Sequence, residues 1–91
     1  MYWTILGDFW KTEPGNDCPS AEVIVTAGNC RRAATALGLS YEGQEDANPF
    51  ISAGCFFTES TVKFNELIDP EKTKPLEQFG GICLKGIFIL L

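Results

Sequence analysis

The sequence predicts an α+β fold in which one main helix, over about residues 27–38, packs on a small, mostly antiparallel sheet stapled by disulfides. Three observations support this prediction. One segment places small and apolar residues at helical spacing, several short segments are rich in β-branched and aromatic residues, and four cysteines are available as cross-links. Because 91 residues leave room for one core only, we expect a single small cysteine-rich domain over residues 1–91.

The N-terminal segment is predicted to be a short strand followed by a loop. Residues 2–6 combine aromatic and β-branched side chains, which favour a pleated, half-buried surface, and Gly7 and Asp8 then interrupt them. Residues 11–20 are dense in proline, glycine and short polar residues, which indicates a loop that carries Cys18.

The main helix has start and stop signals. The Thr26 hydroxyl can accept a hydrogen bond from a free N–H of the first turn, and Gly38 can adopt the left-handed conformation that ends a helix. Between these residues, one helical face carries the residues Cys30, Ala33, Ala34 and Leu37. Since three of the four side chains are small, we expect this face to lie close against the sheet.

The middle of the chain is predicted to contain a surface loop and then a hairpin. Residues 40–52 are mostly polar, which indicates the loop. Segments 54–58 and 61–65 are rich in β-formers and are separated by Glu59 and Ser60, the spacing of a tight turn. Glu-Ser is a poor match to the Asn-Gly type of turn, so the hairpin is predicted from the spacing and not from the turn residues.

The C-terminal segment is predicted to end in a strand. A charged, proline-bounded excursion covers residues 69–75, and the apolar segment 81–90 follows, with a bulge or bend expected at Gly86. Its apolar run is too short to span a bilayer. We expect membrane contact only if the chain continues past Leu91.

Four cysteines in a short chain without histidine predict a disulfide framework and an oxidising compartment. Four cysteines allow three pairings, which the sequence does not distinguish. We favour Cys30 with Cys55, which ties the helix start to the hairpin, and Cys18 with Cys83, which ties the early loop to the last strand. The expected location is extracellular or the lumen of a secretory or other organelle, although the given chain begins without a recognisable signal peptide.

The same composition argues against metal and catalytic sites. Structural zinc sites bring their ligands in close pairs such as C-x-x-C, whereas the gaps between these cysteines are long. No histidine is present for general-base work, and the acidic cluster Glu42, Glu45, Asp46 with Asn48 lacks the ordered spacing of a calcium loop. We therefore predict no catalytic residue, no metal, no cofactor and no enzymatic activity.

Aromatic residues near the N-terminus are the remaining candidates for a binding surface. Trp3 and Trp10 could offer rings to a sugar or a protein partner, because aromatic side chains supply large contact area at low entropic cost. The other interpretation is that the rings belong to the core. We predict a core position for Trp3 and leave both interpretations open for Trp10.

One ordered set of motifs extends over most of the chain. It consists of Cys30-x-x-Ala33-Ala34-x-x-Leu37-Gly38-Leu39, Gly54-Cys55, Phe64-Asn65 and Ile82-Cys83. In this order and spacing the set resembles small four-cysteine modules of predicted proteins from marine microalgae and related protists. Ala53 stands where those modules commonly have proline, and Asn29 where they often have an acidic residue. The resemblance implies a secreted or lumenal interaction module and carries no more specific function.

Together these observations predict a non-enzymatic, disulfide-stabilised interaction module that serves as a domain or accessory subunit of an extracellular or lumenal assembly. The expected partner is another protein. The alternative is a small secreted carbohydrate-binding protein that uses Trp3 and Trp10. Nucleic acid is not expected, because 12 acidic against 7 basic side chains give a formal charge of −5, which repels a phosphate backbone.

Overall fold

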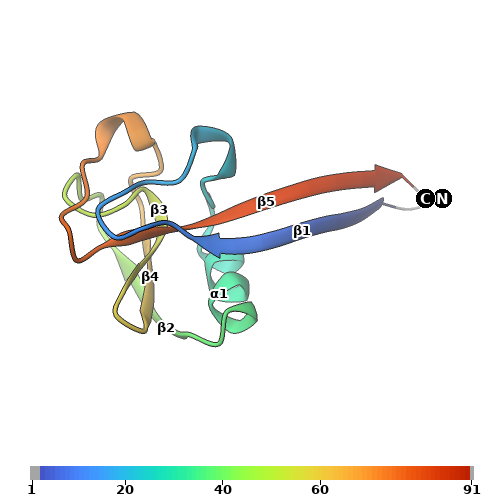
Figure 1. The fold of residues 1–91 in the computed structure, drawn as a ribbon, viewed down its shortest axis with the longest axis horizontal. Helices are drawn as coiled ribbons and strands as arrows, with labels where there is room; N and C mark the ends of the chain where they lie inside the picture. Colours follow the sequence, from blue (N-terminus) through green and yellow to red (C-terminus); the bar gives the residue numbers. More distant parts are fainter. Residues whose placement is uncertain (1–2, 91) are drawn as a thin grey trace.

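The computed structural model describes the backbone of residues 3–90 and the side chains of residues 9–85 (Figure 1). In chain order its elements are β1 (Trp3–Lys11), η1 (Ser20–Glu22), α1 (Ala27–Ala36), β2 (Ser40–Glu45), β3 (Gly54–Thr58), β4 (Thr61–Asn65), η2 (Pro70–Lys72) and β5 (Gly80–Leu90). The described strands form one sheet in the order β1-β5-β3-β4-β2. All pairings are antiparallel except that of β2 with β4, which is parallel. The predicted α+β class is confirmed.

The core lies between α1 and one face of the sheet. The helix contributes small side chains and the strands contribute large ones, and the buried cluster comprises Ile24, Cys30, Ala33, Ala34, Cys55, Phe57, Val62, Phe64 and Ile82. Because side chains alternate along a strand, the residues between these on β3 and β4 face the opposite side of the sheet. Phe56 and Lys63, which lie opposite each other in the register, are two of these residues.

Both ends of α1 follow the predicted capping chemistry. The Thr26 hydroxyl accepts a hydrogen bond from the Asn29 N–H at 3.2 Å. At the other end the Leu39 N–H bonds to the Ala34 carbonyl at 2.8 Å, and Gly38 has a φ of +72°, which is the Schellman arrangement. The helix therefore stops at Ala36, two residues before the predicted limit, because the last predicted residues form its cap.

The two disulfides pair Cys30 with Cys55 and Cys18 with Cys83, which is the favoured pairing. Their Cα atoms lie 5.1 Å and 5.6 Å apart, respectively. All four cysteines are at most 3% exposed, so both cross-links run through the interior. One bond ties the first turn of α1 to β3, and the other ties the loop before η1 to β5.

The prediction for the first strand was too short. β1 continues through Gly7 and Asp8 to Lys11. Its register against β5 is unbroken, with Gly7 opposite Gly86 and Asp8 opposite Lys85, so the bulge expected at Gly86 is also absent. Gly7 and Gly86 lie opposite each other in this register, so neither glycine ends its strand.

The surface loop predicted at residues 40–52 was partly wrong, because its first half is the edge strand β2. This strand pairs parallel to β4, and its register shifts between Tyr41 and Gln44, where Gly43 has a φ of +111°. Its side chains alternate between exposed and half-buried, which suits a polar edge strand with one side chain, Tyr41, packed against the core. An edge strand without a fully buried residue needs little apolar sequence, and this explains the missed element.

The hairpin of β3 and β4 is confirmed, with Thr58 opposite Thr61. Glu59, the first turn residue, has a φ of +54° and is the one non-glycine residue with positive φ in the described part of the chain. A side chain in this conformation is strained, and glycine is the residue that adopts it without steric cost.

We expect Glu59→Gly to raise the free energy of unfolding by roughly 0.5–1 kcal/mol, because relief of the left-handed strain exceeds the entropic cost of a new glycine. Urea unfolding followed by circular dichroism measures the change. Ser60→Gly is the matched control and should be neutral or destabilising, since Ser60 has no positive φ. Equal stabilisation by both variants would contradict the strain at Glu59.

Removing either disulfide is expected to cost several kcal/mol. Loop entropy alone gives about 3.5 kcal/mol for the separation of 25 residues and about 4.3 kcal/mol for the separation of 65 residues. We nevertheless expect Cys30→Ala/Cys55→Ala to be the more damaging variant, because it also releases α1, whose small buried side chains hold it only weakly on the sheet. Urea unfolding of both double variants gives the order, and a larger loss for Cys18→Ala/Cys83→Ala would contradict this account.

Candidate functional site

A two-stranded ribbon extends from the body of the protein, formed by residues 3–9 of β1 and 84–90 of β5 (Figure 1). β5 also pairs with β3, but only at Gly80 and Gly81, and an isolated bridge joins Val23 to Cys83. Beyond these contacts, the described part of the sheet is two strands wide. The ribbon therefore has two open backbone edges.

The residues whose backbone groups point outward follow from the register. The Thr12 N–H donates to the Gly81 carbonyl at 2.9 Å. The backbone groups of this pair of opposite residues, which we call a rung, therefore point inward, toward the other strand of the ribbon. Because inward and outward rungs alternate in an antiparallel pair, the rung of Ile5 and Phe88 points its N–H and C=O groups outward. Each of these two residues thus offers unpaired backbone groups at one of the two edges.

The ribbon is apolar in sequence and electrically neutral. Its charged residues are Asp8 and Lys85, which lie opposite each other in the register. Without this pair, 11 of the 12 acidic and 6 of the 7 basic residues remain, so the whole net charge of −5 lies outside the ribbon. An apolar, neutral and open-edged ribbon is the type of surface that a neighbouring strand covers.

Trp10 lies where the ribbon joins the body. Its side chain is half-buried, and its indole Nε1 donates a hydrogen bond to Glu22 Oε1 at 2.8 Å, which attaches β1 to η1. In the sheet it lies opposite Cys83. Trp3 pairs with Leu90 in the backbone register, but its side chain lies outside the described residues. A contact role for either tryptophan stays a prediction.

A pocket of about 270 Å³ lies on the face of the sheet opposite α1. It is lined by Glu45, Asn48, Ile51, Phe56, Thr58, Lys63 and Phe79. The rings of Phe56 and Phe79 meet edge to face, with centroids 5.9 Å apart and planes at 75°. Beside them Lys63 Nζ forms an ion pair with Glu45 Oε1 at 3.0 Å. The pocket thus combines an aromatic wall with one acid and one base.

The buried Asn65 side chain holds the wall of this pocket in place. Its Oδ1 accepts from the N–H groups of Asn48 and Leu67, both at 3.1 Å. Its Nδ2 donates to the carbonyls of Asn48 at 2.9 Å and Ser52 at 3.1 Å. All four hydrogen-bonding positions of the amide are therefore used, at a residue that is 0% exposed.

A second polar connection joins three segments that are distant in sequence. One oxygen of Asp17 accepts from the Ala53 N–H and the other from the Thr73 hydroxyl, both at 2.7 Å. Thr73 lies in the segment predicted as a proline-bounded excursion, where η2 forms. The body is thus cross-linked by buried polar side chains as well as by disulfides.

Sequence reasoning missed the pocket. It placed Glu45 and Asn48 in a solvated loop and assigned no role to Lys63 or Phe79. One signal was available, because asparagine is depleted in strands and Asn65 is the last residue of the predicted strand 61–65. A buried asparagine at a strand end indicates a side chain that bonds to neighbouring backbone.

Comparison with known proteins matches this chain to no family model, no curated protein and no solved structure. The resemblance to microalgal four-cysteine modules stays a prediction. In the part of the chain that the structure describes, no helix is long and apolar enough to cross a membrane. Support for a function therefore comes from the geometry of the ribbon and the pocket.

We expect Asn65→Asp to lower the free energy of unfolding by about 3 kcal/mol, because the carboxylate would be buried against the carbonyl oxygens of Asn48 and Ser52. Asn48→Asp is the matched control. The Asn48 side chain accepts one hydrogen bond, from the Phe50 N–H, which a carboxylate can also accept, so a change within about 0.5 kcal/mol is expected. Denaturant unfolding of both variants tests the network, and similar losses would contradict it.

Proposed function

We propose that this chain is a non-enzymatic interaction module of an extracellular or lumenal assembly, and that it assembles with a second copy of itself through the β1 edge of the ribbon. The observation that carries the proposal is the open, apolar and neutral ribbon. The two disulfides support the location, because such bonds form and persist in oxidising compartments.

A two-stranded ribbon is marginally stable in water unless something packs against it or extends it. Strand addition satisfies the outward backbone groups and also covers apolar side chains. Each large apolar side chain that becomes fully buried contributes roughly 1.5–3 kcal/mol before the costs of association are subtracted. A partner strand therefore stabilises the ribbon more than it would stabilise the closed body.

A second copy fits this edge. Antiparallel pairing of two β1 strands about Gly7 places Ile5 opposite the Phe9 of the other copy, and both residues belong to rungs that point outward. Asp8 then lies opposite Leu6, so no like charges meet. The two bodies lie at opposite ends of the joined ribbons, roughly 30 Å apart for nine paired residues, where their negative charges are screened at physiological salt.

Sedimentation equilibrium of the intact chain tests this proposal. We expect a monomer–dimer equilibrium that Ile5→Pro weakens at least about tenfold, because two hydrogen bonds across the two-fold axis are lost. Phe88→Pro is the matched control. It removes an N–H of the same rung, but on the β5 edge, so the dissociation constant should stay within about twofold of the wild-type value. Proline at either position leaves the inward rungs intact.

A wild-type chain that stays monomeric at millimolar concentration would overturn the proposal. Equal weakening by both proline variants would place the contact elsewhere on the ribbon and overturn the β1 assignment. Circular dichroism of each variant confirms that the fold is retained.

A further inference from the structure

We propose that the pocket on the face of the sheet opposite α1 binds one ring of a neutral carbohydrate. The pocket is independent of the ribbon, because its lining residues come from β2, β3, β4 and the segments around Asn48 and Phe79. Its ligand can therefore be tested whether or not the chain dimerises.

The size of the pocket selects a small ligand. Its volume of about 270 Å³ lies just below the range of roughly 300–1,000 Å³ that is usual for sites of drug-sized molecules. One six-membered ring with its substituents is small enough to fit this volume. A longer chain would have to continue outside it.

The charges of the pocket favour a ligand without net charge. Lys63 and Glu45 neutralise each other at 3.0 Å, and their side chains remain 35% and 43% exposed. The ammonium keeps free donors and the carboxylate keeps free acceptors. A hydroxyl group both donates and accepts, so two adjacent hydroxyls can bond to both groups without breaking the ion pair. An anion or a cation would have to compete with one of its members.

The aromatic wall suits the apolar face of a sugar ring. Phe79 is half-buried, and Phe56 is 2% exposed and fixes the ring of Phe79 through their edge-to-face contact. Aromatic rings provide large apolar contact area at low entropic cost. A pyranose has C–H groups on its faces and hydroxyls at its rim, which matches a wall of phenylalanine beside an ion pair.

The pocket is preorganised by backbone bonds. Phe79 donates its N–H to the Leu76 carbonyl at 3.0 Å and accepts from the Gly15 N–H at 2.6 Å. On the other side, Asn65 holds the backbone of Asn48 by two hydrogen bonds. A site whose walls are fixed before binding loses less entropy when the ligand enters.

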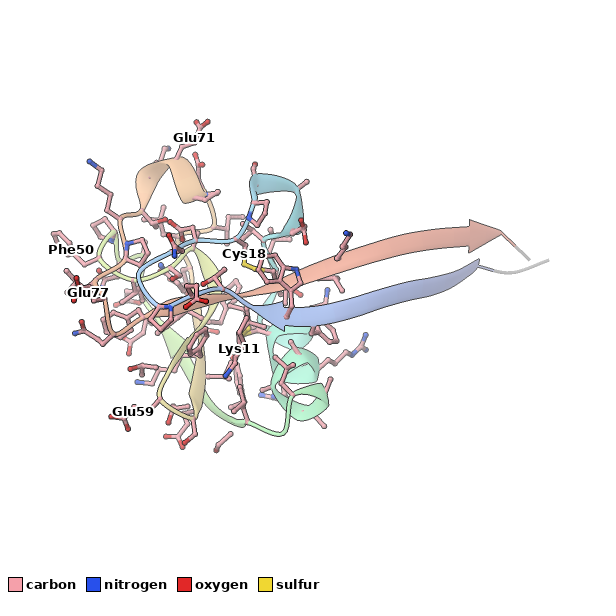
Figure 2. The ribbon with its side chains drawn as sticks, viewed as in Figure 1. Lys11, Cys18, Phe50, Glu59, Glu71 and Glu77 are labelled. Atoms are coloured by element: carbon pink, nitrogen blue, oxygen red, sulfur yellow. A yellow bond between two sulfur atoms is a disulfide. The ribbon has the colours of Figure 1, made fainter. Side chains whose placement is uncertain are left out.

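Two exposed apolar side chains lie in the segments that flank the pocket. Phe50 precedes the lining residue Ile51 and is 61% exposed, and Leu76 is 49% exposed. The Leu76 N–H donates to the Phe50 carbonyl at 2.9 Å, which brings the two segments together. Figure 2 shows Phe50 at the end of the body that lies farthest from the ribbon. These residues offer a surface for neighbouring rings of an oligosaccharide.

Titration of the ¹⁵N-labelled chain with glucose, galactose, mannose and N-acetylglucosamine, followed by amide chemical shifts, tests the proposal. We expect at least one sugar to give saturable shifts confined to the pocket, with a dissociation constant on the order of millimolar, as is reasonable for a ligand of this size. Sodium acetate and n-butylammonium chloride, titrated at equal ionic strength, serve as charged comparison ligands.

The variants Phe79→Ala and Lys63→Gln should each weaken sugar binding at least about fivefold, a loss typical of one aromatic or charged contact. Val25→Ala is the control, because it shortens an exposed apolar side chain outside the pocket and its flanking segments and should leave sugar binding unchanged. Dispersed amide spectra of each variant show that it is folded, and Lys63→Gln provides the test if Phe79→Ala does not fold.

Three outcomes would overturn the assignment. The first is the absence of saturable shifts with all four sugars at about 100 mM, far above the expected millimolar constant. The second is sugar-dependent shifts centred on Trp10 and Glu22, which would place the site at the base of the ribbon. The third is tighter binding of acetate or butylammonium than of any sugar, which would contradict a neutral ligand.

Discussion

The bond between Cys30 and Cys55 is the constraint on which the rest of the body depends. It joins the first turn of α1 to β3 at two positions that are 0% exposed. The buried face of the helix otherwise offers Ala33 and Ala34, whose small side chains bury little apolar area. A helix with this face would be held weakly by burial alone, and the covalent link fixes it where close packing on the sheet becomes possible.

Fixing α1 on one face of the sheet determines what the other face can do. The side chains of Phe57 and Val62 face the helix. Those of Phe56 and Lys63 therefore face the opposite side of the sheet, where they line the pocket. The second disulfide has the corresponding role for the ribbon, because Cys83 lies in β5 directly before the strand leaves the body. Each disulfide thus anchors the base of one of the two proposed binding surfaces.

The features that the sequence predicts correctly depend on local signals. The start of α1, its glycine stop and the two-residue turn at Glu59 and Ser60 can be read within a few residues. The cysteine pairing is favoured among three that the sequence does not distinguish, and the structure shows that pairing. The features it misses depend on partners that are distant in sequence. β1 continues past Gly7 in register with β5, and β2 pairs in parallel with β4. The backbone beside the pocket is held by Asn65, which bonds to Asn48, 17 residues away.

The separation of charge from apolar surface connects the two proposed sites. The ribbon is neutral, the body carries the full net charge of −5, and the ribbon and Phe50 lie at opposite ends of the molecule (Figures 1 and 2). Association through the ribbon therefore brings neutral surfaces together, while charge repulsion between bodies disfavours contacts that would cover the pocket. A dimer joined at its ribbons would present two pockets, one on each body. In such a dimer, two weak sugar sites would bind a multivalent glycan surface more tightly than either site alone.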